Sequence, residues 1–326
     1  MNRRKRKVTI SAASWHRDEV KLLEEMGLSV KIIPDRADAL FQAEVQESDA
    51  LIVGLPPVSR QTMEDAAHLV IVARHGVGYD NVNVDAATEL GIVVTNTPGV
   101  NSDAVAEFTF GLILALVRQI PHGWEEMKNG GWRHSQFYGL DLRGKTLSII
   151  GLGRIGSRVS KLGAAFGMKV LACDPYIPPE SFQNAGAQPV SREEAICRGD
   201  FLTLHTPLTE ETRKMIGSRE LAAMKPTAFL INTSRGGVVD DKALIEALDK
   251  GVLSGAAIDV FEEEPPKDQS LVEHPKILTT PHLAGLTNEA MYRMYMGASE
   301  QVAYALRGER PPYAVNEPQN PRYLTA

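Results

Sequence analysis

Short apolar segments alternate with helical patterns along most of this chain, and this alternation restricts its possible folds more than any other feature. Continuous apolar strands separated by helices are typical of parallel sheets that are buried on both faces. The sequence therefore predicts a doubly wound α/β architecture. The expected strands are residues 8–10, 50–53, 69–73, 147–150, 170–173, 201–204, 228–231, 255–258 and 277–279.

Two long helical patterns indicate how the chain divides into domains. The segment from Asp103 to Val117 is apolar on nearly all sides, so we expect it to be buried between domains or between subunits. Asn288 to Leu306 is a second long helical pattern, close to the end of the chain. We expect residues 1–101 and 288–326 to form one domain and residues 102–287 to form another, inserted within the first.

Composition excludes several broad classes of protein. Hydrophobic residues make up 43% of the 326 residues and charged residues 23%, which are values typical of globular proteins. The net charge of -6 argues against general nucleic-acid binding. We interpret the basic run Arg3–Lys7 as a frayed, solvated terminus. Residues 104–120 are interrupted by polar side chains, so they do not predict a membrane span.

The metal-binding residue types are not clustered in the sequence. The two cysteines, Cys173 and Cys197, have neither a metal-ligand spacing nor the number that a disulfide framework needs. No cluster of His, Cys and Asp has the spacing of a metal site, which argues against a metal-dependent enzyme. We therefore expect no metal, and a location in the reducing cytoplasm.

A glycine-rich motif stands between an expected strand and an expected helix. Residues 146–150 lead directly into Gly151-Leu-Gly153-Arg-Ile-Gly156, and this G-x-G-x-x-G pattern in this context is typical of dinucleotide binding. Gly151 permits a tight turn, Gly153 lets a pyrophosphate approach the backbone, and Gly156 lets the helix pack closely on the strand. Amides at the helix N-terminus then face the phosphates.

An acidic residue follows the next expected strand. Asp174 lies 18 residues after Gly156, where a carboxylate accepts hydrogen bonds from ribose hydroxyls and repels a 2′-phosphate. This position favours NAD over NADP. The structural alternative is that Asp174 only opens a turn with Pro175.

Three candidate catalytic residues each follow an expected strand. Arg235, Glu264 and His282 should therefore lie at the edge of the sheet where open α/β proteins bind ligands. A guanidinium binds the carboxylate and carbonyl oxygen of a 2-keto acid, and a histidine supplies a proton near neutral pH. A carboxylate partner orients the imidazole ring. Singly, each residue has a structural explanation, but together they predict hydride transfer at C2 of a keto acid.

Further motifs occur in order along nearly the whole chain. They are Gly76–Asn81, Val105–Glu107, Gly144–Gly156, His205–Leu208, Asn232–Asp240, Gly255–Pro265 and Pro281–His282. In these motifs the chain resembles the D-isomer-specific 2-hydroxyacid dehydrogenases, the group that contains phosphoglycerate dehydrogenase and glyoxylate/hydroxypyruvate reductase.

The resemblance implies a role for each candidate residue and each domain. It implies a Rossmann NAD-binding domain inserted in a flavodoxin-like substrate domain, with Arg235 binding substrate, His282 as acid/base and Glu264 as its support. It also implies that backbone amides of Gly76, Val77 and Gly78 bind the substrate carboxylate. Members are usually homodimers joined through the cofactor domain, and the helix from Asp103 to Val117 is the expected interface element. From the motif and the resemblance together, the expected NAD contacts are Gly151, Gly153, Arg154, Ile155, Gly156, Asp174, Thr206, Thr233, Ser234, Asp259, His282 and Gly285.

The substrate is less well determined by the sequence. Phosphoglycerate dehydrogenases commonly carry a phosphate-binding arginine directly after the strand that corresponds to residues 50–53, whereas this chain has Gly54-Leu-Pro-Pro-Val58 there. We expect an apolar or uncharged distal group, and the alternative is 3-phosphoglycerate held by Arg60 or Arg74. A different class of function, an NAD-sensing corepressor on the same fold, is distinguished by the absence of turnover with 2-keto acids.

Overall fold

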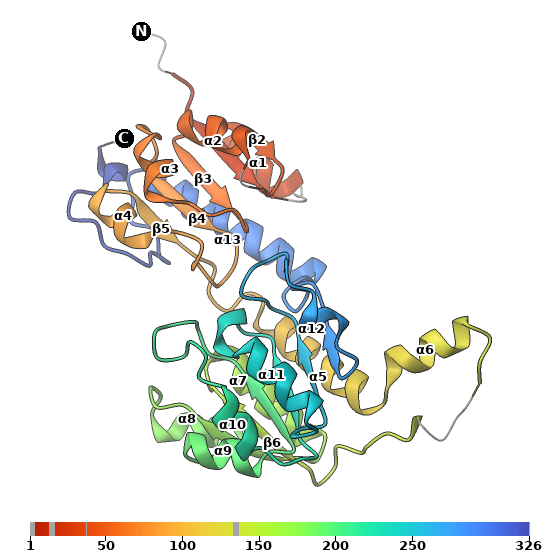
Figure 1. Cartoon of the computed structure of the whole chain (residues 1–326). Coiled ribbons are helices and arrows are strands. Elements are labelled where there is room, and N and C mark those ends of the chain that lie inside the picture. The colour runs from red at the N-terminus through yellow and green to blue at the C-terminus, as the bar shows by residue number, and fades with distance from the viewer. Residues whose placement is uncertain (1–3, 13–16, 37, 133–136, 326) are drawn as a thin grey trace. The chain divides into compact units, whose positions relative to one another are not determined.

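The structure, a computed structural model, describes residues 4–12, 17–36, 38–132 and 137–325. The chain forms two compact units, each with its own parallel sheet (Figure 1). Unit 1 comprises Met1–Asn101 and Thr287–Ala326, and unit 2 comprises Ser102–Leu286. Within the described residues, the paired strands of both sheets are all parallel, so the predicted doubly wound α/β class is confirmed.

The sheet of unit 1 has the strand order β2-β1-β3-β4-β5, which is the flavodoxin-like order. Its central strands are buried on both faces, which explains their continuous apolar sequences. Ile52 of β3 packs in one core with Val302 of α13, while its neighbours Leu51 and Val53 pack in another with Phe41 of α2. The strands are β1 (Lys7–Ser11), β2 (Ser29–Ile33), β3 (Ala50–Val53), β4 (Ile71–Arg74) and β5 (Val93–Thr95), and the helices are α1 (Arg17–Glu25), α2 (Ala39–Gln46), α3 (Arg60–Glu64), α4 (Val84–Glu89), α13 (Asn288–Leu306) and η3 (Arg322–Leu324).

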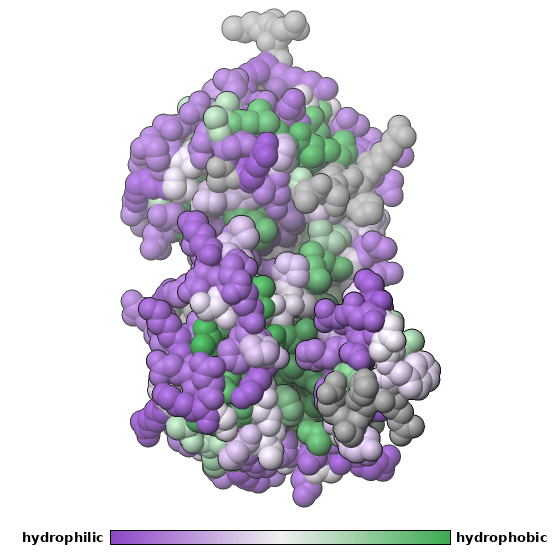
Figure 2. All heavy atoms as spheres, turned by 45° about the vertical axis from the view of Figure 1, so that its right-hand side comes forward, coloured by the Kyte–Doolittle hydropathy of each residue, from purple (hydrophilic) through white to green (hydrophobic). Residues whose placement is uncertain are grey.

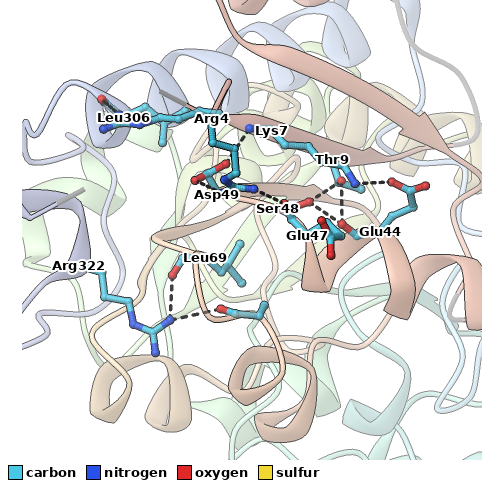
Figure 3. Close-up of polar contacts among 12 residues, drawn as sticks. Arg4, Lys7, Thr9, Glu44, Glu47, Ser48, Asp49, Leu69, Leu306 and Arg322 are labelled. Atoms are coloured by element: carbon cyan, nitrogen blue, oxygen red, sulfur yellow. Dashed lines mark hydrogen bonds and ion pairs between the residues drawn. The ribbon is translucent and has the colours of Figure 1, made fainter. Parts of the chain in front are cut away.

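Arg4 and Lys7, two residues of the basic run expected to be a solvated terminus, are bonded to unit 1, although Arg4 stays exposed. Arg4 donates to Asp49 at 2.7 Å and to the carbonyl oxygen of Glu47 at 3.1 Å (Figure 3). The backbone N–H of Lys7 donates to the other oxygen of Asp49 at 2.7 Å, and its ammonium pairs with Glu44. These bonds to acidic residues at the amino edge of the sheet hold the first residue of β1 and the residues before it in place.

The sheet of unit 2 has seven strands in the order β12-β11-β10-β9-β6-β7-β8. The six strands β6 to β11 have the Rossmann order, with β6 as the first strand at the centre of the sheet. Strand β12 is one further strand beside β11. The strands are β6 (Thr146–Ile150), β7 (Lys169–Cys173), β8 (Gln188–Pro189), β9 (Phe201–Leu204), β10 (Phe229–Asn232), β11 (Gly255–Ile258) and β12 (Ile277–Thr279). The helices are α5 (Ser102–Val117), α6 (Ile120–Lys128), α7 (Arg154–Ala165), α8 (Pro179–Ala185), α9 (Arg192–Arg198), α10 (Ser218–Ala223), η2 (Gly236–Val238), α11 (Asp241–Asp249) and α12 (Ser270–Glu273).

Helix α5 packs with one face on the sheet of its own unit. Phe110 and Ile113 belong to one core with Leu147 of β6 and Val170 of β7, and Phe110 stacks on Phe166 with ring centroids 5.0 Å apart. The apolar character of this helix was expected to reflect burial between domains or subunits. The core of unit 2 contains five of its nine buried residues, Ala106, Phe110, Leu112, Ile113 and Val117, and a further interface on this helix stays a prediction.

Three strands were not predicted from the sequence. Strand β2 has mostly exposed side chains at the edge of its sheet, β5 has only three residues, and β8 has only two.

On the face shown in Figure 2, hydrophilic residues predominate and hydrophobic ones form separate patches. Within the described residues, no single helix has the length and apolar character to cross a membrane, although α5 and α6, joined at a 62° bend, pass that test as a pair.

Candidate functional site

The glycine-rich turn of unit 2 joins β6 to α7 in a conformation that depends on glycine. Gly151 has a φ of 91°, and a Cβ there would lie 2.5 Å from the carbonyl oxygen of His205. A Cβ at Gly156 would collide with the carbonyl oxygen of Gly151. Gly153, in contrast, has open space around its Cα position, so a ligand has access to the backbone there. The turn therefore fits a bound pyrophosphate.

The N-terminus of α7 provides hydrogen-bond donors for an anion. Gly153 is the N-cap and supplies no side-chain cap, and the backbone N–H of Ser157 donates to the carbonyl oxygen of Gly153 at 3.0 Å. The amides of Arg154, Ile155 and Gly156 are therefore the unsatisfied first-turn donors that such a helix offers to a phosphate.

Asp174 follows β7 and is tied to the glycine-rich turn. Its Oδ2 accepts a hydrogen bond from the backbone N–H of Leu152 at 2.8 Å, and its Oδ1 accepts one from Tyr176 at 3.0 Å. A carboxylate has about four lone-pair sites, so both oxygens keep the capacity to accept from a ribose. The bond to Leu152 had no sequence signal, and it fixes the carboxylate beside the predicted pyrophosphate site.

The segments after β9 and β10 carry further predicted cofactor contacts. The hydroxyl of Thr206 is buried and has no hydrogen-bond partner among the described residues, which is the state expected of a group that meets a ligand. The Thr233 hydroxyl lies 3.0 Å from that of Thr109. Ser234 donates through its N–H and its hydroxyl to the Oδ1 of Asn232, at 3.0 and 2.7 Å.

Arg235 is positioned by a side chain that the sequence reasoning missed. The buried Asn232 at the end of β10 donates from its Nδ2 to the carbonyl oxygen of Arg235 at 2.8 Å. Arg235 itself is half-buried and donates from Nη1 to the carbonyl oxygen of Ser234 at 2.7 Å. The next residue, Gly236, packs so closely on the backbone of Phe261 that a Cβ would collide with it. The turn with Arg235 therefore lies directly against the start of the segment with Glu264.

Glu264 and His282 form a hydrogen-bonded pair beyond β11 and β12. The Nδ1 of His282 lies 2.7 Å from Oε2 of Glu264, while Oε1 of Glu264 accepts from the backbone N–H of Phe261 at 3.0 Å. Burial tends to raise the pKa of Glu264, but the hydrogen bond and charge of His282, the Phe261 amide and the charge of Arg235 together hold that pKa below its usual value. Glu264 is therefore an ionised partner, which leaves Nε2 of His282 as the ring nitrogen for a substrate.

The backbone of His282 is in the left-handed region, with a φ of 54°. Such a conformation in a residue other than glycine persists only where the surroundings enforce it. Here Asp259, which is fully buried, enforces it. Its carboxylate accepts from the Thr280 hydroxyl at 2.6 Å and from the amides of Leu283 and Ala284 at 2.8 and 2.9 Å.

These bonds give Asp259 a structural role, and its predicted contact with NAD stays a prediction. Its side chain is wholly enclosed and engaged with the turn that carries His282. We therefore assign it to positioning this turn. Gly285 is half-buried at the end of the same turn.

The predicted carboxylate-binding loop of the substrate lies in unit 1, directly after β4. Gly76 has a φ of 152°, and its carbonyl oxygen accepts from the amide of Thr97 at 2.9 Å. Asn96 donates to the carbonyl oxygen of Val77 at 2.7 Å. Carbonyl oxygens of this loop are thus bonded within unit 1, and Val77 and Gly78 remain half-buried.

An acidic cavity of about 590 Å³ lies beside the Glu264 segment but does not contain the candidate triad. Its lining includes Asp240, Asp241 and Glu262. Burial first, then the charges of Glu262 and Asp240, raise the pKa of Asp241 to about 6. The lining also includes Lys214, Lys242 and Lys267, so carboxylates outnumber ammonium groups in this cavity. Among the described residues, no group of three or more His, Cys, Asp or Glu side chains is placed to hold a metal ion.

Comparison with known proteins gives one consistent result. Residues 110–284 match the model of the "D-isomer specific 2-hydroxyacid dehydrogenase, NAD binding domain" family. The chain is 43% identical over 309 residues to a D-3-phosphoglycerate dehydrogenase of Methanocaldococcus jannaschii, covering 94% of this chain and 59% of the relative. It is 43% identical over 283 residues to a glyoxylate reductase of Thermococcus litoralis, covering 84% of this chain and 85% of the relative.

A solved structure resembles the fold over almost its full length. It is a D-lactate dehydrogenase of Aquifex aeolicus complexed with NAD and lactic acid, with a TM-score of 0.85 and 28% identity. The match covers 96% of this chain and 100% of the other. In contrast, the chain spans only 59% of the Methanocaldococcus phosphoglycerate dehydrogenase and 51% of the human one.

Proposed function

Because the chain belongs to the D-isomer specific 2-hydroxyacid dehydrogenase family, we propose that it transfers a hydride between NAD(H) and C2 of a small D-2-hydroxy or 2-keto acid. The observation that carries this proposal is the pair of His282 and Glu264, joined at 2.7 Å, beside the turn with Arg235. The three residues follow β12, β11 and β10, which are adjacent strands of one sheet.

Each side chain has a distinct part in the proposed reduction. Arg235 binds the carboxylate and polarises the carbonyl oxygen of the keto acid through its planar donors. His282 donates the proton on Nε2 to that oxygen, and Glu264 stabilises the charged ring and fixes its orientation. NADH, when bound, supplies the hydride. In the direction of oxidation, His282 accepts the proton from the hydroxyl group.

The cofactor is NAD, and the described residues fit it. The open backbone at Gly153, the amide donors at the start of α7 and the buried hydroxyl of Thr206 are groups for its binding. The carboxylate of Asp174 supports a preference for NADH over NADPH, because a 2′-phosphate would meet a negative charge there.

The proposed substrate has no phosphate group. Arg60, one of the two arginines considered for a phosphate, is engaged with Glu89 at 2.5 Å and with Glu64 at 3.5 Å on the exposed surface of unit 1. A guanidinium already paired with two carboxylates is a weak site for a dianion, because the phosphate must compete with them. Glyoxylate, pyruvate and hydroxypyruvate are therefore the first compounds to assay.

The test is the loss of NADH absorbance with a panel of short 2-keto acids, repeated with NADPH. We expect turnover of at least one 2-keto acid whose distal group is uncharged. We also expect kcat/KM for that acid to be at least about tenfold higher with NADH than with NADPH. Binding of NADH without turnover of any acid would overturn the dehydrogenase proposal and favour a corepressor-like binding protein.

We also propose that the protein is a homodimer in the cytoplasm, with α6 as part of the interface. Helix α6 extends away from the sheet of unit 2 (Figure 1), and none of its residues is buried. Trp124 is 65% exposed and Met127 54% exposed on α6, and Trp132, just beyond it, is 73% exposed. Exposed aromatic and methionine side chains in one segment are typical of a protein interface. These exposed side chains support α6 as part of the proposed interface, and the expected contribution of α5 stays a prediction.

The dimer is tested by light scattering of the purified protein. We expect the Trp124→Glu/Met127→Glu variant to be monomeric, because two buried carboxylates would be unpaired in the interface. Leu324→Glu is the matched control, since Leu324 is 61% exposed in unit 1. A wild-type monomer, or a variant that still dimerises, would contradict the proposal.

A further inference from the structure

A polar cluster stands at the carboxyl edge of the sheet of unit 1, where β1, β2, β3 and β4 end (Figure 1). Its centre is Asp35, two residues after β2. Asp35 Oδ1 accepts a hydrogen bond from the Ser11 hydroxyl at 3.2 Å, and Oδ2 accepts one from the backbone N–H of Leu55 at 3.3 Å. The carboxylate therefore reaches from the edge strand, past β1, to the turn that follows β3.

The same carboxylate meets the end of β4. A Cβ built on Gly54 would lie 2.7 Å from Oδ1 of Asp35 and 2.7 Å from Nε2 of His75. Asp35 and His75 thus converge on one point above the Cα of Gly54. His75 stacks edge-on against Tyr295 of α13, with ring centroids 4.9 Å apart, and it immediately precedes Gly76 of the predicted carboxylate-binding loop.

Asn81 holds the Gly54 turn and the Gly76 loop together. Its Nδ2 donates to the carbonyl oxygens of Gly54 and Pro56, at 3.0 and 2.8 Å. The backbone N–H of His75 also donates to the carbonyl oxygen of Val53 at 3.1 Å. Asp35 therefore lies close to His75, the residue that precedes the Gly76 loop, within the same unit.

The surroundings of Asp35 disfavour the charged form of its carboxyl group. Burial raises its pKa above the usual value, against the lowering effects of the Leu55 amide, the Ser11 hydroxyl and the charge of Arg74. A carboxylate whose charged form is penalised by the fold is a candidate for a functional role. Its charge also offsets that of Arg74, the remaining arginine considered for a phosphate.

We propose that Asp35 determines specificity for the distal end of the substrate, selecting an uncharged group that donates a hydrogen bond and disfavouring a phosphate or second carboxylate. The inference rests on the proposed dehydrogenase function. An ionised carboxylate only accepts hydrogen bonds, so a hydroxyl at C3 of the keto acid donates to it. An anion at the same place is repelled by Asp35 and gains little from the offset charge of Arg74.

The test compares hydroxypyruvate with its 3-phosphorylated form, using the full chain and NADH. Wild type should prefer hydroxypyruvate, and Asp35→Asn should reduce the ratio of the two kcat/KM values roughly tenfold, which corresponds to about 1.4 kcal/mol. Asn keeps the size of the side chain, so a purely structural role would change stability without changing this ratio. Pyruvate, which has no distal polar group, should be reduced by both proteins at similar rates.

Two further variants separate the explanations. In Asp35→Asn/Arg74→Gln, the gain for the phosphorylated acid should disappear, because that gain depends on the positive charge of Arg74, which Asp35 no longer offsets. Asp49→Asn removes the same charge at the opposite, amino edge of the sheet (Figure 3) and should leave the ratio unchanged.

The outcomes distinguish this inference from the proposed function. A wild type that prefers the phosphorylated acid, or an Asp35→Asn variant with an unchanged ratio, overturns the inference and leaves the dehydrogenase proposal intact. A wild type that reduces none of the acids overturns both.

Discussion

At the scale of single residues, the candidate site depends on side chains that hold other side chains. Asn232 fixes the backbone of Arg235, and Asp259 fixes the turn of His282 in a left-handed conformation. The chemistry itself was predictable, because Arg235, Glu264 and His282 each follow a recognisable strand. The supporting bonds were not, because a buried Asn or Asp has no sequence pattern that identifies its partners.

The residue-scale prediction concerns the proton donor. His282→Asn should lower kcat by about 10²–10⁴-fold, the usual contribution of general acid catalysis. NADH affinity should stay within about twofold of wild type, as measured by fluorescence titration. Turnover near the wild-type rate would show that the proton comes from another group.

Glu264→Gln tests the partner of the histidine. The pKa of Glu264 is held below its usual value, so the wild type should lose activity only when this carboxylate is protonated at low pH, and Glu264→Gln should lack that pH-dependent loss. The measurement is a pH profile of kcat/KM for both proteins. Coincident profiles would mean that protonation of Glu264 does not govern the loss of activity at low pH.

At the scale of elements, the order of strands explains why distant segments meet. Most buried strands of both sheets were predicted because they are continuous apolar runs. The edge strand β2 was missed because its side chains are mostly exposed, and β5 because three residues carry too little pattern. The close packing of the turn at Gly236 on the segment at Phe261 is a tertiary contact, so local sequence did not reveal it.

The element-scale prediction uses this contact. Gly236→Ala should lower kcat/KM by at least about tenfold, because a methyl group there must separate the Arg235 turn from the Glu264 segment. Gly237→Ala is the matched control, since its Cβ would first meet the flexible end of Arg213 at 3.3 Å. Equal kinetics for the two variants, assayed with the same keto acid, would argue against the importance of this contact.

At the scale of the whole molecule, each unit encloses a neutral histidine. Burial, joined by the charge of Arg74, lowers the pKa of His75 in unit 1 to about 3. Burial also lowers the pKa of His205 in unit 2 to about 3. In the unfolded chain both residues titrate near 6.5, so below that pH the unfolded chain binds more protons than the folded one. Stability is therefore retained above pH 6.5 and lost as the pH falls toward 3.

The whole-molecule prediction follows from this difference in protonation. Urea unfolding should show a free energy that falls between pH 7.5 and pH 5, by up to about 1.4 kcal/mol per pH unit for each histidine. His205→Gln should reduce this slope, whereas His122→Gln, at an exposed position of α6, should not. An equal slope in all three proteins would show that burial of His205 does not govern acid sensitivity.

The division of unit 1 into two separated segments has a consequence for synthesis on the ribosome. Ala298 and Val302 of α13 complete a core that begins with Val8 and Ile10, so nearly three hundred residues must be translated before that core closes. All of unit 2 emerges in the meantime. One apolar face of the first sheet is therefore exposed to solvent until α13 has been synthesised. During that time the nascent chain is a substrate for chaperones.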